Sequence, residues 1–522
     1  MDHNSNSSSR MIYWIIALGI GIRVFAAIYT YAINPDGMVY IQQAKAIYYG
    51  NWKLLRSCVP FVSSYPFLIA SAFSAFHSWI GSARLVSVFF GSLTLVPLYF
   101  LLKRFTDERT TCLSVLLYAF MPALVSRSAD LIRDPICWFF LASGLYFFVR
   151  QMETGETFRR RFFYLMSSYA LFLVACWARP ETFIVLIFSC FYSLLHSVFS
   201  KEKRYLFVAV ASLVFLGLFL TAGGMVFGPS FNSYSTAASG KLSASYEAYR
   251  NLRQHLSSLG SDLDRGALRS FLFQVRHFTW LVDLGILVGN TISGVFYFYF
   301  PFFVFGFLGL SARLRKDARV VYLLILVILG YSLLFVHVLQ FWYLEDRFLY
   351  IIIFSGCILG AFGIEQTARY IRSKVNWKVS VVAILISIYI LGFGLGKNLK
   401  KREDDKVVFP QIAEYISGLE KPDHKFAPVL TSDSSSLKLV PFYLNLRLSA
   451  GFCPVDSAPV IKTNEELFQY VRENNVKYFL WDEKGWQNTS VDIRSDDFRR
   501  NFDDLAQWYH QYYGHIILFG RK

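Results

Sequence analysis

The stretch INPDGMVYIQQAKAIYYGNW, residues 33–52, follows the apolar run 12–33 and decides what the chain forms after its first membrane span. After Asp36, apolar residues recur at helical spacing, which predicts a helix over 37–49 that Gly50 ends. This helix is too short and too polar to cross a bilayer, so we expect it to lie flat along the outer membrane surface. Asp36 then has two interpretations: it caps the helix, or it is a functional carboxylate held at the membrane surface.

The composition is that of a membrane protein. Of the 522 residues, 55% are hydrophobic, 18% are aromatic and only 17% are charged. The apolar residues form long blocks, which predict several membrane-spanning helices. The formal net charge of +16 does not indicate nucleic-acid binding, because Lys and Arg collect on the cytoplasmic loops of multi-span proteins. We therefore expect membrane lipids, and no nucleic acid, among the partners.

We predict a multi-span α-helical membrane protein with about 11–13 transmembrane helices and a small C-terminal extramembrane α/β domain. Eleven blocks are long enough, or nearly so, to cross a hydrocarbon core of ~30 Å. They cover residues 12–33, 83–102, 111–127, 135–150, 162–178, 181–199, 205–226, 286–310, 319–340, 348–366 and 378–397. The stretch Tyr65–Gly81 has two interpretations, a twelfth span or an interfacial or re-entrant helix.

Basic clusters indicate the orientation of these spans. They lie in five loops, at Lys103-Arg104, Arg159–Arg161, Lys201–Arg204, Arg313–Arg319 and Arg369–Lys374. The positive-inside rule puts these loops in the cytoplasm, and they alternate correctly if Tyr65–Gly81 does not cross. The basic cluster Lys397–Arg402 is an exception, because it would lie outside. We accept it, since the opposite orientation would misplace the other five clusters.

This orientation predicts three parts of the chain. Residues 1–10 form a polar N-terminal tail, residues 11–397 form a transmembrane domain, and residues 398–522 form a periplasmic or extracellular domain. The long outer loops of the transmembrane part are residues 34–82 and 227–285. We expect a multi-pass protein of the cell (inner) membrane whose long outer loops face the periplasm or exterior.

The C-terminal part alternates strand and helix patterns at an ordinary charge density. Strands are predicted at Ala427–Asp433, Lys477–Glu483 and His515–Gly520. An amphipathic helix is predicted at Asn464–Asn475. These elements indicate a small α/β domain outside the membrane.

Acids and arginines collect at the predicted outer ends of spans that are far apart in the sequence. They are Asp36, Asp130, Arg133, Asp134, Arg179, Glu181, Glu345, Asp346 and Arg347. An ionisable group at a membrane needs a partner or a function. The set is therefore typical of a site that several loops assemble.

The two acids Asp130 and Asp134 also have a purely structural interpretation. They are four residues apart, so on a helix their like charges would repel. Arg127 or Arg133 would relieve that repulsion. Alternatively, Asp134 caps the helix that begins at Pro135, a residue favoured in a first turn.

The two arginines Arg179 and Arg347 have two interpretations as well. A lone arginine at a helix end usually reaches lipid headgroups. Two arginines on the same face as the acids instead suit a phosphate group, because a guanidinium binds phosphate with a two-pronged fork.

Several motifs then follow one another along the chain. They are PDGMVYIQQAKAIYYGNW (35–52), YPFLIA (65–70), ARLVSVFFGSLTLVPLYFLLKRF (83–105), RDP (133–135), ARPE (178–181) and DRFLYIIIF (346–354). Their order and spacing resemble polyprenyl-phosphate-sugar-dependent glycosyltransferases of the GT-C fold, which include lipid A aminoarabinose transferases and protein O-mannosyltransferases (glycosyltransferase family 39 and relatives). The resemblance covers residues 12–200 and 340–365. One departure is Tyr65-Pro66, where the aminoarabinose branch has a Lys before its double Pro.

The resemblance implies an inverting transfer of a sugar from a polyprenyl-phosphate donor to a hydroxyl of a lipid, glycan or protein acceptor. Asp36 would be the catalytic base, and Arg347 and Arg179 would bind the donor phosphate. The other implied site residues are supporting acids (Asp134, Asp130 and Glu181) and residues that position the acceptor or the helices (Tyr40 and Arg84).

No residue spacing indicates a metal or cofactor site. A divalent metal stays an alternative, for which Asp36 and Asp134 are the candidate carboxylates. The functional alternatives are a transporter or flippase of lipid-linked sugars, a glycan ligase or polymerase, and a non-catalytic receptor. Transporters place charges at mid-membrane or show repeats, whereas these charges lie at one edge, with Arg23 inside the first span as the exception.

The long outer loop Gly228–Leu284 carries five arginines among Ser and Gly, namely Arg250, Arg253, Arg265, Arg269 and Arg276. One interpretation is a mobile cover that binds donor or acceptor. The other is a surface-lying helix that binds anionic headgroups.

Overall fold

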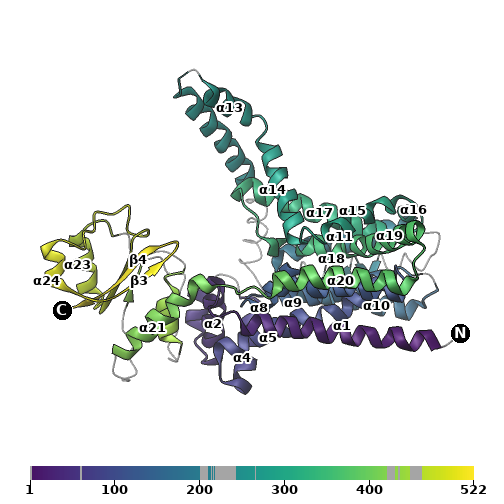
Figure 1. Cartoon of the computed structure of the whole chain (residues 1–522), viewed down its shortest axis with the longest axis horizontal. Coiled ribbons are helices and arrows are strands. Elements are labelled where there is room, and N and C mark those ends of the chain that lie inside the picture. Colours follow the sequence, from purple (N-terminus) through teal and green to yellow (C-terminus); the bar gives the residue numbers. More distant parts are fainter. Residues whose placement is uncertain are drawn as a thin grey trace. The chain divides into compact units, whose positions relative to one another are not determined.

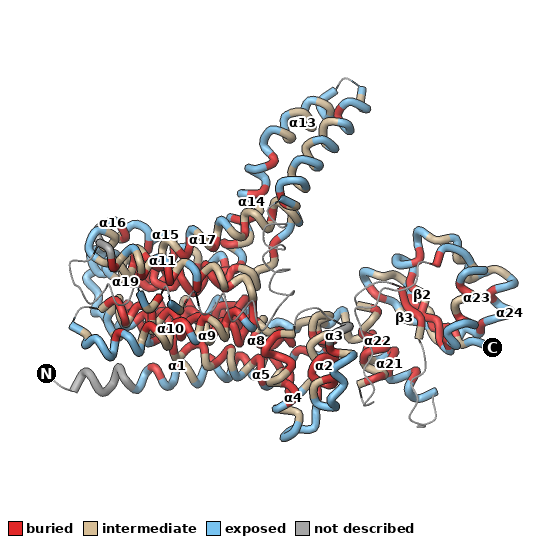
Figure 2. Tube along the Cα trace, turned by 180° about the vertical axis from the view of Figure 1, so that it is seen from behind, coloured by how far each residue is buried: buried red, intermediate tan, exposed pale blue. Residues whose placement is uncertain are grey.

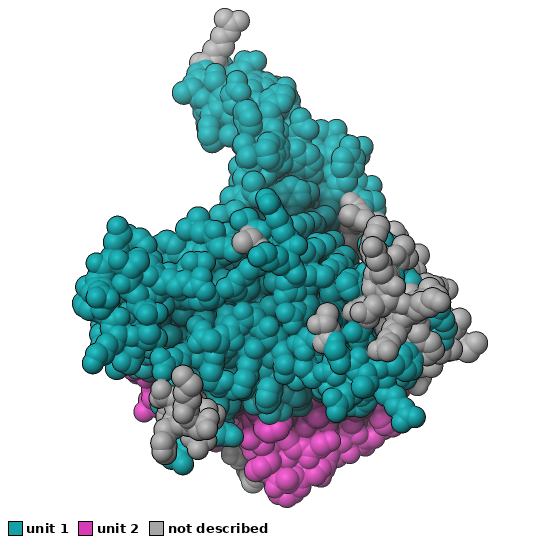
Figure 3. All heavy atoms as spheres, turned by 90° about the vertical axis from the view of Figure 1, so that its right-hand side faces the viewer, with its two compact units in different colours: residues 1–23, 90–127, 134–398 teal, residues 24–89, 128–133, 399–522 magenta. Residues whose placement is uncertain are grey.

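The computed structural model describes residues 3–58, 62–153, 155–199, 210–212, 214–215, 217, 243–264, 266–419, 429–432, 436–446 and 461–522. It is mostly helical, with one small sheet (Figure 1). The chain divides into two compact units, which Figure 3 distinguishes by colour. The first unit contains residues 1–23, 90–127 and 134–398, and the second contains residues 24–89, 128–133 and 399–522.

The first unit is a bundle of helices whose buried residues line the faces that pack together (Figure 2). Most of α1 (His3–Ile28) belongs to it. The other elements are α6 (Leu95–Leu102), α7 (Glu108–Phe120), α8 (Pro122–Ala129), α9 (Asp134–Gln151), α10 (Phe158–Ala178), η1 (Pro180–Thr182), α11 (Phe183–Phe199), α13 (Ala267–Val275), α14 (Thr279–Gly294), α15 (Phe300–Leu308), α16 (Leu310–Leu314), α17 (Ala318–Phe341), η2 (Asp346–Leu349), α18 (Tyr350–Ser355), α19 (Cys357–Val375) and α20 (Val379–Asn398).

The predicted multi-span membrane protein is confirmed. Six of the described helices are long and apolar enough to cross a membrane, or up to nine if each of three bent pairs is one span. In one pair, the axes of α7 and α8 are bent by 50° at the break between them. Helix α8 begins at Pro122, and a proline at this position cannot continue the preceding helix. The predicted span 205–226 lies largely outside the described residues.

Two glycines let helices α15 and α19 pack closely. A Cβ at Gly363 would lie 1.6 Å from the carbonyl oxygen of Phe302, and one at Gly306 would lie 2.1 Å from that of Leu359. Any larger residue at either position would force the helices apart. Small residues have this role in many membrane helix pairs, where close backbone approach drives association.

Arg23 lies inside α1 and is 1% exposed. Its guanidinium donates to the carbonyl oxygens of Gly19 and Ala119, each at 2.9 Å. Arg23 therefore faces inward and bonds to backbone, and among the described residues no carboxylate pairs with it. This arrangement explains a charge that the sequence alone leaves as an exception.

The second unit combines helices with the only sheet of the described residues. Its helices are α2 (Pro35–Tyr48), α3 (Trp52–Cys58), α4 (Ser64–Phe76), most of α5 (Trp79–Leu93), η3 (Asp404–Val407), α21 (Val408–Leu419), α22 (Leu439–Asn445), α23 (Asn464–Glu473) and α24 (Asp496–Asn501). Helix α4 has 13 residues, which at ~1.5 Å each give ~20 Å. That length is too short for a span, and it favours the interfacial or re-entrant interpretation of Tyr65–Gly81.

The sheet has four strands in the order β1-β2-β4-β3. Strand β1 (Val429–Leu430) pairs parallel with β2 (Tyr478–Asp482), and β4 (Gly514–Arg521) pairs antiparallel with β2 and with β3 (Phe502–His510). The predicted strands at 477–483 and 515–520 are therefore confirmed. Strand β3 was not predicted, because most of its residues are exposed or half-buried and its apolar pattern is weak.

A compact aromatic core holds this sheet and its helices together. Phe479 is fully buried and lies near Phe498, Phe502 and Phe519, with ring centroids 5.9–6.1 Å apart. Buried Leu467 and Val471 of α23 pack into the same cluster. The predicted amphipathic helix thus covers one side of the small sheet.

Candidate active site

Asp36 lies in the second unit, in the first turn of α2, and is half-buried. Helix α2 begins at Pro35, and Asn34 holds the N-cap position. The capping interpretation of Asp36 is therefore wrong, because Asp36 is already the second helical residue. A carboxylate in a first turn is favoured by the partial positive charge of the helix N-terminus.

The segment 128–133 packs against the start of α2. The Oδ1 atom of Asn34 accepts a hydrogen bond from the Leu131 amide at 3.0 Å. A Cβ added to Gly37 would lie 2.8 Å from the Cβ of Leu131. The absence of a side chain at Gly37 thus lets this segment approach the turn that carries Asp36.

Asp130 comes from this same segment and is 4% exposed. It pairs with Arg402, whose guanidinium nitrogen lies 3.2 Å from the Asp130 carboxylate. Arg402 also forms a backbone bridge with Thr30, and Arg84 of α5 donates to the Thr30 carbonyl oxygen. One residue of the basic cluster that opposed the positive-inside assignment, Arg402, therefore has a buried acid as its partner.

Tyr40 belongs to an aromatic pair on the next turn of α2. Its ring lies 5.3 Å from that of Tyr65, edge to face. The Tyr65 hydroxyl donates to the Ala83 carbonyl oxygen at 2.9 Å and is 2.8 Å from the Ser87 hydroxyl. Ser87 in turn donates to the Ile132 carbonyl oxygen at 3.3 Å. Tyr40 thus rests on a network that joins α2, α5 and the segment 128–133.

Helix α2 is more buried than the sequence predicts. Gln42, Gln43 and Lys45, the polar residues that stand between the apolar ones, are at most 2% exposed. Lys45 Nζ donates to the carbonyl oxygens of Asn445 and Leu446, at 2.9 and 3.4 Å. Burial lowers the pKa of Lys45 to about 8. The polar side chains of α2 therefore contact protein, notably at the end of α22.

The remaining predicted site residues lie in the first unit, where Asp134 begins α9. Its carboxylate lies 2.6 Å from the guanidinium of Arg179, and the two side chains are 1% and 4% exposed. Glu181 in η1 is farther from Arg179, at 4.0 Å, and is half-buried. Asp134 and Arg179 thus form a closed ion pair at the junction of α9, α10 and η1.

A second cluster of charges adjoins this pair. Glu345 lies 2.8 Å from Arg347 and 3.7 Å from Arg127, which also lies 3.3 Å from Asp346. The Arg347 side chain is 17% exposed. This cluster brings Glu345, Asp346 and Arg347, from the predicted outer loop 341–347, to Arg127 in the last turn of α8.

A small cavity of about 10 Å³ lies in this cluster. Arg127, Arg347 and Asp346 line it together with apolar residues, and so do Trp138 and Tyr350. The Tyr350 hydroxyl is 3.0 Å from that of Thr182, next to the Arg179 pair. The cavity thus has room for one water molecule, and two guanidinium groups reach it.

A divalent-metal site is the remaining alternative for Asp36 and Asp134. Among the described residues, no group of three His, Cys, Asp or Glu side chains is placed to hold a metal ion. Asp36 belongs to the second unit and Asp134 to the first.

Comparisons with known proteins agree with this architecture. Residues 59–220 match the family model described as dolichyl-phosphate-mannose-protein mannosyltransferase. None of the curated protein sequences compared with the chain matches it. The structure of ArnT from Cupriavidus metallidurans in the apo state superimposes with a TM-score of 0.60 at 12% identity, covering 98% of each chain.

The chain has the GT-C fold. A second ArnT structure, bound to undecaprenyl phosphate, gives a TM-score of 0.56 at 11% identity over 97% of each chain. The archaeal oligosaccharyltransferase AglB from Archaeoglobus fulgidus, in complex with an inhibitory peptide and a dolichol-phosphate, gives 0.53 at 12% identity, covering 90% of this chain and 70% of that one. The resemblance that the motifs indicate is confirmed at the level of the fold.

Proposed function

We propose that this GT-C protein transfers a sugar from a polyprenyl-phosphate donor to an acceptor hydroxyl at the outer face of the membrane. The observation that carries the proposal is the GT-C fold over nearly the whole chain, with a half-buried carboxylate, Asp36, in the first turn of α2. Similar structures are described with undecaprenyl phosphate and with a dolichol-phosphate. Both are polyprenyl phosphates, which supports this class of donor.

In the proposed reaction, the acceptor oxygen attacks the anomeric carbon while Asp36 takes the hydroxyl proton. The bond between that carbon and the donor phosphate oxygen breaks. Polyprenyl phosphate leaves with the bonding electron pair, and the sugar configuration is inverted.

Arg347 is the better candidate for stabilising the departing phosphate. Arg179 is only 4% exposed and is engaged by Asp134 at 2.6 Å. Arg347 also pairs with an acid, Glu345 at 2.8 Å, but it is 17% exposed, and its side chain lines the water-sized cavity beside Tyr350. We therefore assign phosphate binding to Arg347 and a positioning role to the pair of Arg179 and Asp134.

A second candidate function is the transfer of a larger glycan. The AglB structures, which belong to an oligosaccharyltransferase, share the fold and favour this alternative to a single-sugar transfer. A transporter or flippase of lipid-linked sugars is the third candidate. The experiment below separates the three by their products.

The test replaces Asp36 by Asn, which keeps the shape of the side chain and removes its basicity. Lipids and surface glycans are analysed by mass spectrometry in cells that express the wild type, the D36N variant or no protein. We expect D36N to lose the modified product, with a rate ~10²–10⁴-fold lower in a purified assay with radiolabelled donor. The size of the missing product distinguishes one sugar from a whole glycan.

A matched control is Asp496→Asn, another first-turn acid in the second unit, on α24 of the sheet region. D496N should transfer sugar at the wild-type rate. Full transfer by D36N would refute the assignment of the base. Movement of the labelled donor across the membrane by D36N, with no product even from the wild type, would instead establish the flippase.

A further inference from the structure

A helical hairpin in the first unit carries a pocket that the proposed transfer reaction does not use. One arm is a helix over residues 243–261, and the other is α13. Figures 1 and 2 show both arms standing off the bundle beyond α14. Between the first arm and the end of α13 lies a cavity of about 410 Å³, within the range of small-ligand sites (~300–1,000 Å³).

The lining of this hairpin pocket is positively charged. Arg250 and Arg253 come from the first arm, and Arg276 and His277 come from the residues that follow α13. Among the described residues, no carboxylate lines the pocket, and none forms an ion pair with these three arginines. Three guanidinium groups facing one cavity repel one another, and an anion between them would relieve that repulsion.

Contacts within the hairpin hold two of the arginines in place. Arg276 donates to the Ser257 hydroxyl at 2.8 Å and lies 5.0 Å from the ring centre of Phe273. Arg253 lies 5.7 Å from the ring centre of Tyr249. Stacked guanidinium groups keep their N–H edges pointing away from the ring, which leaves them available to a ligand. Arg253 and Arg276 are thus ordered before any ligand arrives.

We propose that the hairpin pocket is an accessory site for a phosphate group. Phosphate fits the fork geometry of several arginines better than a carboxylate does, because it offers three or four oxygens. The same hairpin exposes large apolar side chains, with Leu259, Leu268 and Phe271 at 53%, 59% and 61% exposure. Exposed apolar residues beside a basic pocket are typical of surfaces that meet lipid headgroups.

This inference is independent of the transfer reaction, because its readout is binding. The full chain is purified in a non-ionic detergent, and bound lipid is counted by native mass spectrometry. Dioleoyl phosphatidate is the probe, and dioleoylglycerol, which has the same tails and lacks the phosphate, is its control. Inorganic phosphate is added as a competitor to separate a lipid source from free phosphate.

Two pocket variants and one matched variant decide the outcome. The double variant R250Q/R253Q and the single variant R276Q should each bind phosphatidate about tenfold more weakly, as expected for lost charge-assisted hydrogen bonds. Arg269 is the matched control, because it lies on the same hairpin, 5.7 Å from the Phe273 ring centre, but outside the pocket lining. R269Q should bind as the wild type does.

Each result has a defined meaning. Competition by inorganic phosphate would show that the site accepts free phosphate as well as a lipid phosphate, and its absence would assign the site to lipid. The proposal is overturned if the wild type does not bind phosphatidate, or if it binds dioleoylglycerol equally well. It is also overturned if R269Q weakens phosphatidate binding as much as the pocket variants do. If R276Q does not fold, R250Q/R253Q alone decides, because its two residues lie on the first arm.

Discussion

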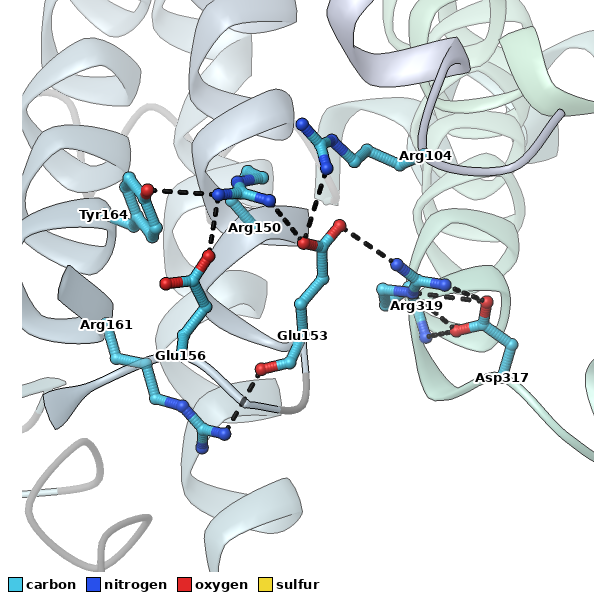
Figure 4. A network of polar contacts seen from close by, with 8 residues as sticks. All are labelled: Arg104, Arg150, Glu153, Glu156, Arg161, Tyr164, Asp317 and Arg319. Atoms are coloured by element: carbon cyan, nitrogen blue, oxygen red, sulfur yellow. Dashed lines mark hydrogen bonds and ion pairs between the residues drawn. The ribbon is translucent and has the colours of Figure 1, made fainter. Parts of the chain in front are cut away.

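Helices α9 and α10 carry charged side chains at both ends, so the two ends of the bundle can be compared. At one end, the connection between them holds Glu153, whose carboxylate accepts from Arg150 at 2.5 Å and from Arg319 of α17 at 3.2 Å (Figure 4). At the other end lies the pair of Asp134 and Arg179. Helix α9 has 18 residues, which separate the two ends by ~27 Å.

The Glu153 end is a closed network. Arg104 approaches Glu153 at 3.6 Å, Arg161 donates to its carbonyl oxygen at 3.2 Å, and Glu156 pairs with Arg150 at 2.7 Å. Several helices and their connections are therefore held by one residue. Three of the basic clusters assigned to the cytoplasmic side, around Arg104, Arg161 and Arg319, contribute to it.

The Asp134 end uses the same chemistry with a different result. Asp134 and Arg179 are buried and closed, but the adjoining cluster of Arg127, Glu345 and Arg347 lines a cavity. The comparison teaches that ion pairs alone do not mark a site. Paired charges that are partly exposed and border a cavity, as Arg347 does, are candidates for ligand binding, whereas a buried pair at a helix junction, such as Asp134 and Arg179, stabilises the fold.

The largest expected effect is that of Asp134→Asn. This change leaves the Arg179 guanidinium buried without its closest carboxylate, which costs roughly 3–5 kcal/mol of unfolding free energy. Thermal unfolding in detergent, followed by intrinsic fluorescence, measures the loss. The double variant D134N/R179Q should recover part of it, because no buried charge is then left unpaired. An unchanged unfolding temperature for D134N would show that the pair is not a structural one.

The next effect is that of Arg347→Gln on transfer. If Arg347 stabilises the departing phosphate, R347Q should lower kcat/KM ~10–100-fold, as loss of a charged hydrogen bond of ~1.5–3 kcal/mol implies. R347K should retain part of the rate, because it keeps the charge and loses the fork. The control is Arg319→Gln at the opposite end, which should transfer normally once folded. Equal losses in R347Q and R319Q would remove the functional distinction between the two ends.

The sequence predicted best what depends on short-range spacing. Gly50 follows the end of α2 with a φ of 71°, and strands β2 and β4 coincide with predicted apolar runs. Each of these features follows from residues that are neighbours in the chain. The same locality explains why the outer acids and arginines could be named as a set.

The residues that pair with these charged side chains could not be predicted, because such pairs depend on tertiary packing. The Asp130–Arg402 pair joins residues 272 positions apart, and nothing in either local sequence indicates the other. Lys45 looks solvated in the helical pattern of α2, yet the carbonyl groups at the end of α22 make its burial tolerable. The spacing of apolar residues along the chain does not indicate polar contacts between residues that are far apart in the sequence.

The smallest effect, and the sharpest test of the comparison, is that of Glu153→Gln. The amide keeps the size of the side chain but removes the charge that Arg104, Arg150 and Arg319 share, so we expect a loss of about 1–2 kcal/mol in unfolding free energy. Sugar transfer per folded molecule should stay at the wild-type level, because this network lies at the end of α9 away from Asp134. Glu156→Gln is the matched control and should cost less, since Arg150 keeps its shorter contact to Glu153. A variant E153Q that unfolds at the wild-type temperature but transfers no sugar would mean that chemistry, and not stability, is the role of this end.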